Sequence, residues 1–521
     1  MKHTYSDRQI DNEDVAKFQR ILNSHNKWFI KMFEICSEWG QEERINKNMT
    51  EGGEQTCPLT CLIKDHKGWS FTEDTPHPPS RPVIAGNVGI NRCLSETLSL
   101  IIEPIIQNMK SHAIDSTGNM LSLIDDINNA GVIKEMCTVD PRNEDPEHHD
   151  EDTNEMSECE KHNKIGVEAS ISNRVEFLRS AMIDDSPVPD IKKRLTGVGL
   201  IDRITPLGVP IKLPVNDYRA KEDIPPVQEA GFVMVGSDVE KLFPSLKPLE
   251  AARLTRMAVL ETDISINNFD PYIGMRYIFI MGGREFVERS GLSKYCPTWL
   301  GERVDLISIS GKKTNEDKSW RDTSRDIPDH DIKKIVGAVL EIGILVTMGT
   351  HLYTFDGSTY IQLTGGPIGL RLTAALANLV MAYFDQALER LLLREKLKPN
   401  LMFRFVDDGR IGLRPVRAGW RWVGGGMKYN TDWVDEDKNM GPQKRTTKVI
   451  HEALNSISDY LRFTTEDHLD FGEMKLPTLD CQLWVNDYKI IYEFYEKPQV
   501  ANRTLQSDTA LSRTSLDASL T

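Results

Sequence analysis

Long helical patterns alternate with short extended ones along this chain. Residues 15–39 predict a polar helical lead-in, apolar residues recur at helical spacing in residues 91–109, and residues 370–397 form a third helical pattern without glycine or proline. Apolar runs of strand length occupy residues 231–239 and 402–413. Because helical spacing and strand-length runs occur in separate segments, the sequence predicts a protein of mixed α-helix and β-sheet.

Residues 402–413 predict a β-hairpin with two adjacent aspartates at its turn. A short apolar run precedes Asp407 and Asp408, and Gly409 and a second apolar run follow them, which is a hairpin pattern. Two like charges side by side repel each other, so they require a counter-charge, and a divalent cation is a natural one. Asp and Gly are also the usual residues of a solvated turn, which is the alternative for this dipeptide.

A third carboxylate, Asp238, ends the apolar run that begins at Gly231, and a helix-like segment starts a few residues later. An aspartate at the end of a buried strand faces a cleft rather than bulk water. The alternative is that Asp238 caps the following helix. Taken with Asp407 and Asp408, it favours a metal site built from two distant parts of the chain.

Composition and charge modify this picture. A chain of 521 residues with 39% hydrophobic residues is expected to form two to four packed lobes. The net charge of −15 argues against a nucleic-acid partner, but residues 141–160 hold nine acidic residues and one arginine, and the remainder has a net charge of −7. This acidic block is typical of a disordered insertion.

The residues around the paired aspartates are basic and partly aromatic. The contrast between this basic neighbourhood and the acidic pair suits a site that holds both a metal and phosphates. The basic and aromatic residues concerned are Arg404, Arg410, Arg414, Arg417, Arg421, Trp420 and Trp422.

No membrane segment or secretion signal is expected. The most apolar long stretch, residues 335–349, contains Glu341 and is interpreted as a buried helix or strand pair. The first residues lack the apolar core of a secretory signal. The eight cysteines are scattered, and no second close pair completes a zinc site with Cys57 and Cys61. We therefore expect an intracellular protein in a reducing compartment, not a secreted one.

Two further segments carry groups suited to a triphosphate. Residues 61–68 and 81–86 predict extended segments joined by a loop, and their basic residues Lys64, Lys67 and Arg81 could clamp a triphosphate. Scattered basic residues in a hairpin are more often simply solvated. The glycine-rich loop 365–369 leads into a long helix, and glycines there permit the close approach of a backbone or a ligand.

In this order the motifs resemble those of retroelement reverse transcriptases, nearest to Penelope-like and related non-LTR elements. Residues 238–243 are similar to the family's first palm motif, an aspartate followed five positions later by an aromatic residue. Residues 405–408 are similar to its signature of an aromatic residue, any residue and two aspartates. The fingers, the glycine loop with its helix, and the primer-grip hairpin have counterparts in residues 62–86, 365–378 and 476–483. The resemblance covers roughly residues 57 to 500.

The resemblance implies an α+β right-hand polymerase with a ferredoxin-like palm, helical and β fingers, and a partial thumb. The implied parts are a helical lead-in at 1–56, fingers at 57–230 with the acidic insertion near 141–164, a palm at 231–500 with a surface insertion near 300–330, and a polar tail or thumb start at 501–521. The palm motifs are expected at 231–246, 365–391, 402–413 and 474–485.

The resemblance also implies two-metal phosphoryl transfer, in which a primer 3′-hydroxyl is extended with dNTPs. The implied catalytic residues are Asp238, Asp407 and Asp408, and together with Val239 they are the implied ligands of two Mg²⁺ ions, for which Mn²⁺ could substitute. The bulky ring of Phe243 is expected to exclude a ribose 2′-hydroxyl.

Further roles follow from the same resemblance. The implied nucleotide-binding residues are Lys67, Arg81, Phe243, Gly366 and Gly369; the implied primer-grip residues are Leu479 and Asp480. A possible general acid is Lys475, with Lys444 and Lys448 as alternatives that spacing does not separate.

The implied partners are an RNA or DNA template, a DNA primer and dNTPs, with no membrane, in the nucleus and cytoplasm. Two alternatives stay open. One is a catalytically inactive or domesticated protein that keeps the fold and binds nucleic acid. The other is an RNA-dependent RNA polymerase, which the Phe405-Val406 pair before the aspartates and the bulky Phe243 disfavour.

Overall fold

The fold is taken from a computed structural model of the 521-residue chain. The structure describes residues 9–10, 12–33, 57–63, 80–84, 89–109, 111–138, 225–262, 269–295, 327–362 and 365–495. The predicted acidic insertion near 141–164 and most of the predicted surface insertion near 300–330 lie outside these residues.

A four-stranded antiparallel sheet forms one half of the described structure. Its strands lie in the order β11-β4-β8-β7. Helix α16 lies between β4 and β7 in sequence, and helix α18 between β8 and β11, so the connectivity is βαββαβ with the first strand next to the fourth and the third, which is ferredoxin-like. The bounds are β4 Val233–Val239, α16 Arg371–Arg394, β7 Pro399–Phe405, β8 Asp408–Leu413, α18 Pro442–Ile457 and β11 Phe463–Glu466.

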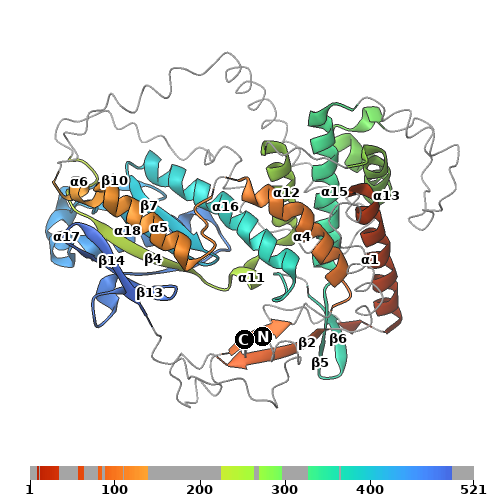
Figure 1. The fold of residues 1–521 in the computed structure, drawn as a ribbon, viewed down its shortest axis with the longest axis horizontal. Coiled ribbons are helices and arrows are strands. Elements are labelled where there is room, and N and C mark those ends of the chain that lie inside the picture. Colours follow the sequence, from red (N-terminus) through yellow and green to blue (C-terminus); the bar gives the residue numbers. More distant parts are fainter. Residues whose placement is uncertain are drawn as a thin grey trace.

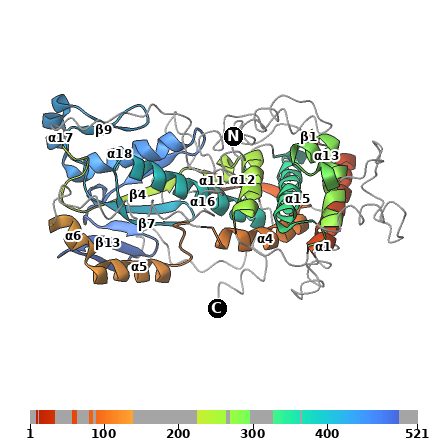
Figure 2. The same cartoon turned by 90° about the horizontal axis from the view of Figure 1, so that it is seen from above.

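The two faces of this sheet are buried against different elements, because successive side chains of a strand point to opposite faces. Val235 and Ile411 belong to the core that α16 and α18 cover, whereas Met234 and Phe403 belong to a second core. Figure 2 shows the covering elements of this second core on the other side of the sheet from α16 and α18. They are α5 Thr117–Ala130, α6 Val132–Thr138 and the sheet of β12 Leu476–Thr478, β13 Cys481–Asn486 and β14 Lys489–Phe494.

Short elements surround the sheet. A hairpin of two three-residue strands, a 3-10 turn and a short helix follow β8; a single helical turn follows β4, and another 3-10 turn follows β11. These are β9 Trp420–Trp422, β10 Met427–Tyr429, η5 Thr431–Trp433, α17 Val434–Met440, η6 His468–Asp470 and α11 Leu242–Ser245.

A helical lobe forms the other half (Figure 1). It comprises α1 Asn12–Phe33, α4 Arg92–Gln107, α12 Pro248–Glu261, α13 Pro271–Arg289, η4 Ser293–Tyr295 and α15 Asp329–Gly349. The predicted palm at 231–500 therefore encloses α12, α13 and α15, which pack with the N-terminal helices rather than on the four-stranded sheet.

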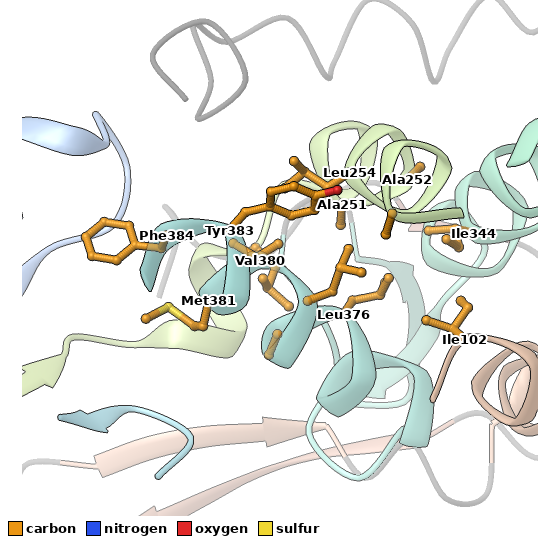
Figure 3. Packing of buried hydrophobic residues seen from close by; sticks show 14 of the residues in the cluster. Ile102, Ala251, Ala252, Leu254, Ile344, Leu376, Val380, Met381, Tyr383 and Phe384 are labelled. Atoms are coloured by element: carbon orange, nitrogen blue, oxygen red, sulfur yellow. The ribbon is translucent and has the colours of Figure 1, made fainter. Parts of the chain in front are cut away.

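Helix α16 connects the two halves. Its residues Leu376 and Val380 face α4, α12 and α15 at one end, while Phe384 lies toward the sheet (Figure 3), where its ring stacks on Phe463 of β11 with centroids 4.6 Å apart. Fully burying a Leu or Phe side chain contributes about 1.5–3 kcal/mol, so this helix fixes the helical lobe to the sheet.

A second, five-stranded sheet lies beneath the helical lobe in the view of Figure 1, in the order β1-β6-β5-β2-β3. Strands β2 and β5 are parallel and the other pairs antiparallel. The bounds are β1 Gln9–Ile10, β2 Cys57–Ile63, β3 Ser80–Ile84, β5 Leu352–Phe355 and β6 Ser358–Ile361. The expected pairing of the segments that carry Cys61 and Arg81 is confirmed, since β2 and β3 are neighbours.

The predicted helices at 91–109 and 370–397 are confirmed as α4 and α16, and residues 335–349 belong to helix α15 rather than to a strand pair. Mixed helix and sheet is what the structure shows. Among the described residues no helix is both long enough and apolar enough to cross a bilayer.

Candidate acidic site at the β4–β8 strand pair

The three predicted aspartates meet at one edge of the four-stranded sheet. Asp238 of β4 is the direct antiparallel partner of Asp408 of β8, and the Val239 backbone N–H donates to the Asp407 carbonyl at 3.1 Å. Directly opposed residues share a face, with Cβ atoms about 4.5–5.5 Å apart. The expected proximity of Asp238 to the 402–413 hairpin is therefore confirmed.

Asp238 does not cap a helix, so the alternative interpretation of this residue is wrong. It lies within β4, and the N-cap position of the following helix α11 is Lys241, without a side-chain cap. The Asp238 side chain is exposed at the sheet edge, where solvent or a ligand can reach it.

The turn between β7 and β8 has a strained backbone. Val406 has φ 55°, a left-handed conformation that is a genuine outlier for a β-branched residue. Strain of this kind persists only where the surroundings enforce it, and it is concentrated at functional sites. Here the turn presents Asp407 next to β4.

A buried ion pair beneath the turn enforces this conformation. Arg404 of β7 donates to both carboxylate oxygens of Asp385 on α16 at 3.0–3.2 Å and, through Nη1, to the Val406 carbonyl at 2.6 Å. Both side chains are buried. A cavity of about 20 Å³ adjoins the pair and Asp407; it has room for about one water molecule, so a nucleotide would have to bind on the exposed side of the edge.

A second buried arginine lies beside the aspartates. Arg410 follows Asp408 by two positions in β8, on the same face, and forms an ion pair with it and a longer one, 3.5 Å, with Glu466 of β11. Its side chain is 2% exposed. Gly236 lies between these strands, and a Cβ there would be 2.8 Å from Glu466 Cγ and 3.2 Å from Arg410 Nη1, so only glycine leaves room for the contact.

Glu466 adds a fourth carboxylate that the sequence analysis did not identify. Burial raises its pKa, Arg410 opposes this effect, and the charges of Asp408 and Asp238 raise the pKa further. Glu466 therefore belongs electrostatically to the aspartate group. Its sequence, Phe-Thr-Thr-Glu, carries no motif, and only the pairing of β11 with β4 places it there.

The glycine loop contacts the segment that follows Asp238. The Gly365 N–H donates to the Leu246 carbonyl at 3.0 Å and the Gly366 N–H to the Phe243 carbonyl at 2.8 Å. Gly365 has φ 72°, and a Cβ would lie 2.5 Å from the Pro244 carbonyl oxygen. Two of the predicted nucleotide-binding residues, Phe243 and Gly366, are thus adjacent; the third, Gly369, is exposed at the entry to α16 with φ 92°.

The remaining predicted residues contact groups other than the aspartates or lie outside the described side chains. Lys475 pairs with Glu493 and, at 3.4 Å, with Glu473, and these interactions raise its pKa. Leu479 forms the β12–β13 turn with φ 54°, and Asp480 accepts from Thr117 Oγ1 at 3.1 Å.

Of the two alternatives to Lys475, Lys444 of α18 pairs with Asp470 and Asp467 at 2.5 and 3.1 Å. Burial lowers its pKa, but these hydrogen bonds outweigh the effect and the pKa is raised. Lys448 lies on the same helix. Lys67 is outside the described residues, and of Arg81 only the backbone, in β3, is described.

The arginines near the aspartates were expected to form a basic neighbourhood suited to a metal and phosphates, and three of them are buried. Arg404, Arg410 and Arg414 are at most 5% exposed, and Arg414 donates to the Met136 carbonyl at 2.6 Å. Arg421 pairs with Asp437. The guanidinium groups of Arg404, Arg410 and Arg414 donate to acceptors inside the protein. They lie on both faces of the sheet, because Arg404 pairs with Asp385 of α16 whereas Arg410 donates to Thr478 of β12.

The described carboxylates offer candidate magnesium ligands rather than a complete protein cage. Within the described ranges no group of three or more His, Cys, Asp or Glu side chains is arranged to hold a metal ion. Mg²⁺ usually binds through one or two carboxylates, waters and substrate phosphates rather than in an all-protein cage. Asp238 is exposed and Asp407 is half-buried, and each offers a carboxylate oxygen, the type of donor that Mg²⁺ and Mn²⁺ prefer.

No protein-family model matches this chain, and neither a curated protein nor a solved structure matches it. The functional inference therefore rests on the residues and on their geometry.

Proposed function

We propose that the protein is an RNA-directed DNA polymerase of the reverse transcriptase type, which extends a primer 3′-hydroxyl with dNTPs on an RNA or DNA template. The observation that carries the proposal is the placement of Asp238 opposite Asp408, with Asp407 at the adjoining turn, on the edge of a βαββαβ sheet. A group of carboxylates held by neighbouring strands, with Asp238 exposed, suits phosphoryl transfer, which depends on positioning and electrostatics.

In this proposal Asp238 and Asp407 hold the metal ions, with the Val239 backbone beside them, and Asp408 completes the charge of the group. The bound ions would lower the pKa of the primer hydroxyl and neutralise charge on the triphosphate. Phe243 and Gly366, which contact each other through the backbone, form the side of the nucleotide site. Phe243 is half-buried and supplies the bulk that would exclude a 2′-hydroxyl.

Other parts of the chain have proposed roles at the ends of the substrate. The β12–β13 hairpin with Leu479 and Asp480 would support the primer, and Lys67 and Arg81 would contact phosphates. Lys475 as the proton donor to pyrophosphate has less support, because its partners are Glu473 and Glu493.

Primer extension by the purified full chain tests the proposal. On poly(rA)·oligo(dT) with Mg²⁺ or Mn²⁺, we expect dTTP incorporation that falls at least 100-fold in Asp238→Asn and Asp407→Asn. Asp435→Ala is the matched control, because this carboxylate is 97% exposed on α17. Template binding without incorporation would replace the proposal with an inactive binding protein, and preference for UTP with an RNA polymerase.

A further inference from the structure

The guanidinium group of Arg410 has an acceptor for each of its hydrogens. Nε donates to Thr478 Oγ1 at 2.8 Å, Nη1 to Asp408 Oδ1 and to the Gly409 carbonyl at 2.7 Å, and Nη2 to Glu466 Oε1 at 3.5 Å and to the Pro477 carbonyl. A guanidinium has five N–H donors in a rigid fork, so five acceptors saturate it. The group is therefore fixed in place.

The position of this cation explains how three carboxylates are tolerated on one face of the sheet. Asp238 and Asp408 are directly opposed, and like charges in that relationship are destabilising. Arg410 lies one pleat further along the same face and is paired with Asp408 and Glu466. A buried guanidinium whose partners were removed would itself be strongly destabilising, so cation and carboxylates depend on one another.

The same group joins the aspartate edge to a different sheet. Thr478 and Pro477 belong to β12, and both accept from Arg410. Because the guanidinium group binds β12 through Thr478 and Pro477 and binds Asp408 through Nη1, a displacement of the β12–β13 hairpin would move Asp408. This connection does not depend on the backbone hydrogen bonds of either sheet.

We infer that Arg410 is a positioning residue: it acts as a permanent counter-cation for Asp408 and ties this aspartate to the β12–β13 hairpin. The assignment of Asp238 and Asp407 as metal ligands is that of the proposed function. The inference rests on the proposed function for its link to catalysis. The pairing itself concerns only this chain's residues.

A double-mutant cycle in the full chain tests the pairing without reference to activity. Asp408→Asn is compared in the wild-type and Arg410→Met backgrounds by denaturant unfolding. In the wild-type background, Asp408→Asn removes the ion-pair partner of Arg410 and lowers the equilibrium constant for folding. In the Arg410→Met background, Asp408→Asn relieves the repulsion between Asp408 and Asp238 and raises that constant. We expect the two effects to differ by at least about tenfold. Equal effects in both backgrounds would overturn the inference.

If Arg410→Met does not fold, Thr478→Val, which removes a single acceptor, takes its place in the cycle and is expected to couple to Asp408→Asn.

Mn²⁺ binding, measured by titration calorimetry, separates a positioning role from a merely structural one. Asp238→Asn and Asp407→Asn should each weaken binding at least tenfold, and Asp408→Asn less than threefold. Arg410→Met should bind Mn²⁺ at least about fivefold more tightly, because a positive charge is removed from the group, while primer extension falls. If Arg410→Met only damaged the fold, both Mn²⁺ affinity and primer extension would fall.

The outcomes distinguish the two proposals. Weakening by Asp408→Asn equal to that by Asp407→Asn, or weaker Mn²⁺ binding in Arg410→Met, overturns the role of Arg410 even if extension is normal. Absence of Mn²⁺ binding and of extension in the wild type counts against the proposed polymerase, and the unfolding cycle then decides the pairing by itself.

Discussion

Arg404 and Asp385 form a bidentate ion pair, with N–O distances of 3.0–3.2 Å, that joins β7 to α16 directly beneath the Val406–Asp407 turn. Both side chains are less than a tenth exposed. The same guanidinium holds the Val406 carbonyl at 2.6 Å. The strained turn that presents Asp407 is therefore supported from within the core and not by the exposed loop itself.

Removing one partner of this pair should be costly. Arg404→Met leaves the Asp385 carboxylate buried without its cation, and we expect a loss of about 3–5 kcal/mol in the free energy of unfolding, measured with denaturant. The double variant Arg404→Met/Asp385→Leu removes both charges and should recover part of that loss. A double variant no more stable than Arg404→Met would show that the interaction is not the cause.

Gly236→Ala tests the close packing of Arg410 and Glu466. The new methyl group would displace one of these side chains, and overpacking of this kind costs about 1–3 kcal/mol. We also expect weaker primer extension, since Asp408 depends on Arg410. The matched control is Gly472→Ala, because a Cβ at Gly472 meets nothing within 4 Å. Equal stability of the two variants would contradict the packing described.

Two buried histidines should make the helical lobe sensitive to acid. Burial lowers the pKa of His25, which contacts Tyr277 at 2.7 Å, to about 4, and that of His351, which contacts Asn91 at 3.3 Å, to about 3. Between the unfolded value of 6.5 and these values the unfolded chain binds protons that the folded chain does not. Stability therefore falls as the pH falls through this range.

The slope of the unfolding free energy against pH measures this effect. Near pH 5 the two histidines should contribute an uptake of about two protons on unfolding, and the double variant His25→Gln/His351→Gln should remove that contribution. His330→Gln, at an exposed position of α15, is made in parallel as a control for replacing a histidine of the same lobe. If the slope is unchanged in the double variant, His25 and His351 are not the source of the pH dependence of the unfolding free energy.

Strong local patterns were predictable from the sequence. The strand that ends at Asp238, the hairpin at 402–413 and helix α16 each combine an apolar pattern with a clear boundary, and each forms where expected. The proximity of Asp238 to this hairpin was predicted, but its antiparallel pairing with Asp408 was not, because no local rule specifies which strands become neighbours.

The roles of the arginines and of Glu466 were not predictable in this way. Arg410 and Arg414 look like a surface cluster in the sequence, but alternation along β8 and its pairing with β4 direct them to the covered face. Glu466 joins the aspartates only through the register of β11. The placement of α12, α13 and α15 with the N-terminal helices likewise depends on packing partners that are distant in sequence.

Phe243 provides a test of the proposed nucleotide site that is separate from the metal-binding residues. Its carbonyl is held by the Gly366 N–H at 2.8 Å, and its ring is half-buried against the core, so the ring position is fixed by two neighbouring segments. Phe243→Val removes bulk while keeping an apolar side chain. If the ring excludes a 2′-hydroxyl, the ratio of UTP to dTTP incorporation on poly(rA)·oligo(dT) should rise at least tenfold, equivalent to about 1.4 kcal/mol of discrimination. Phe494→Val, 81% exposed on β14, is the matched control. An unchanged ratio in Phe243→Val, with dTTP incorporation intact, would place the sugar-discriminating group elsewhere and leave the aspartate site unaffected.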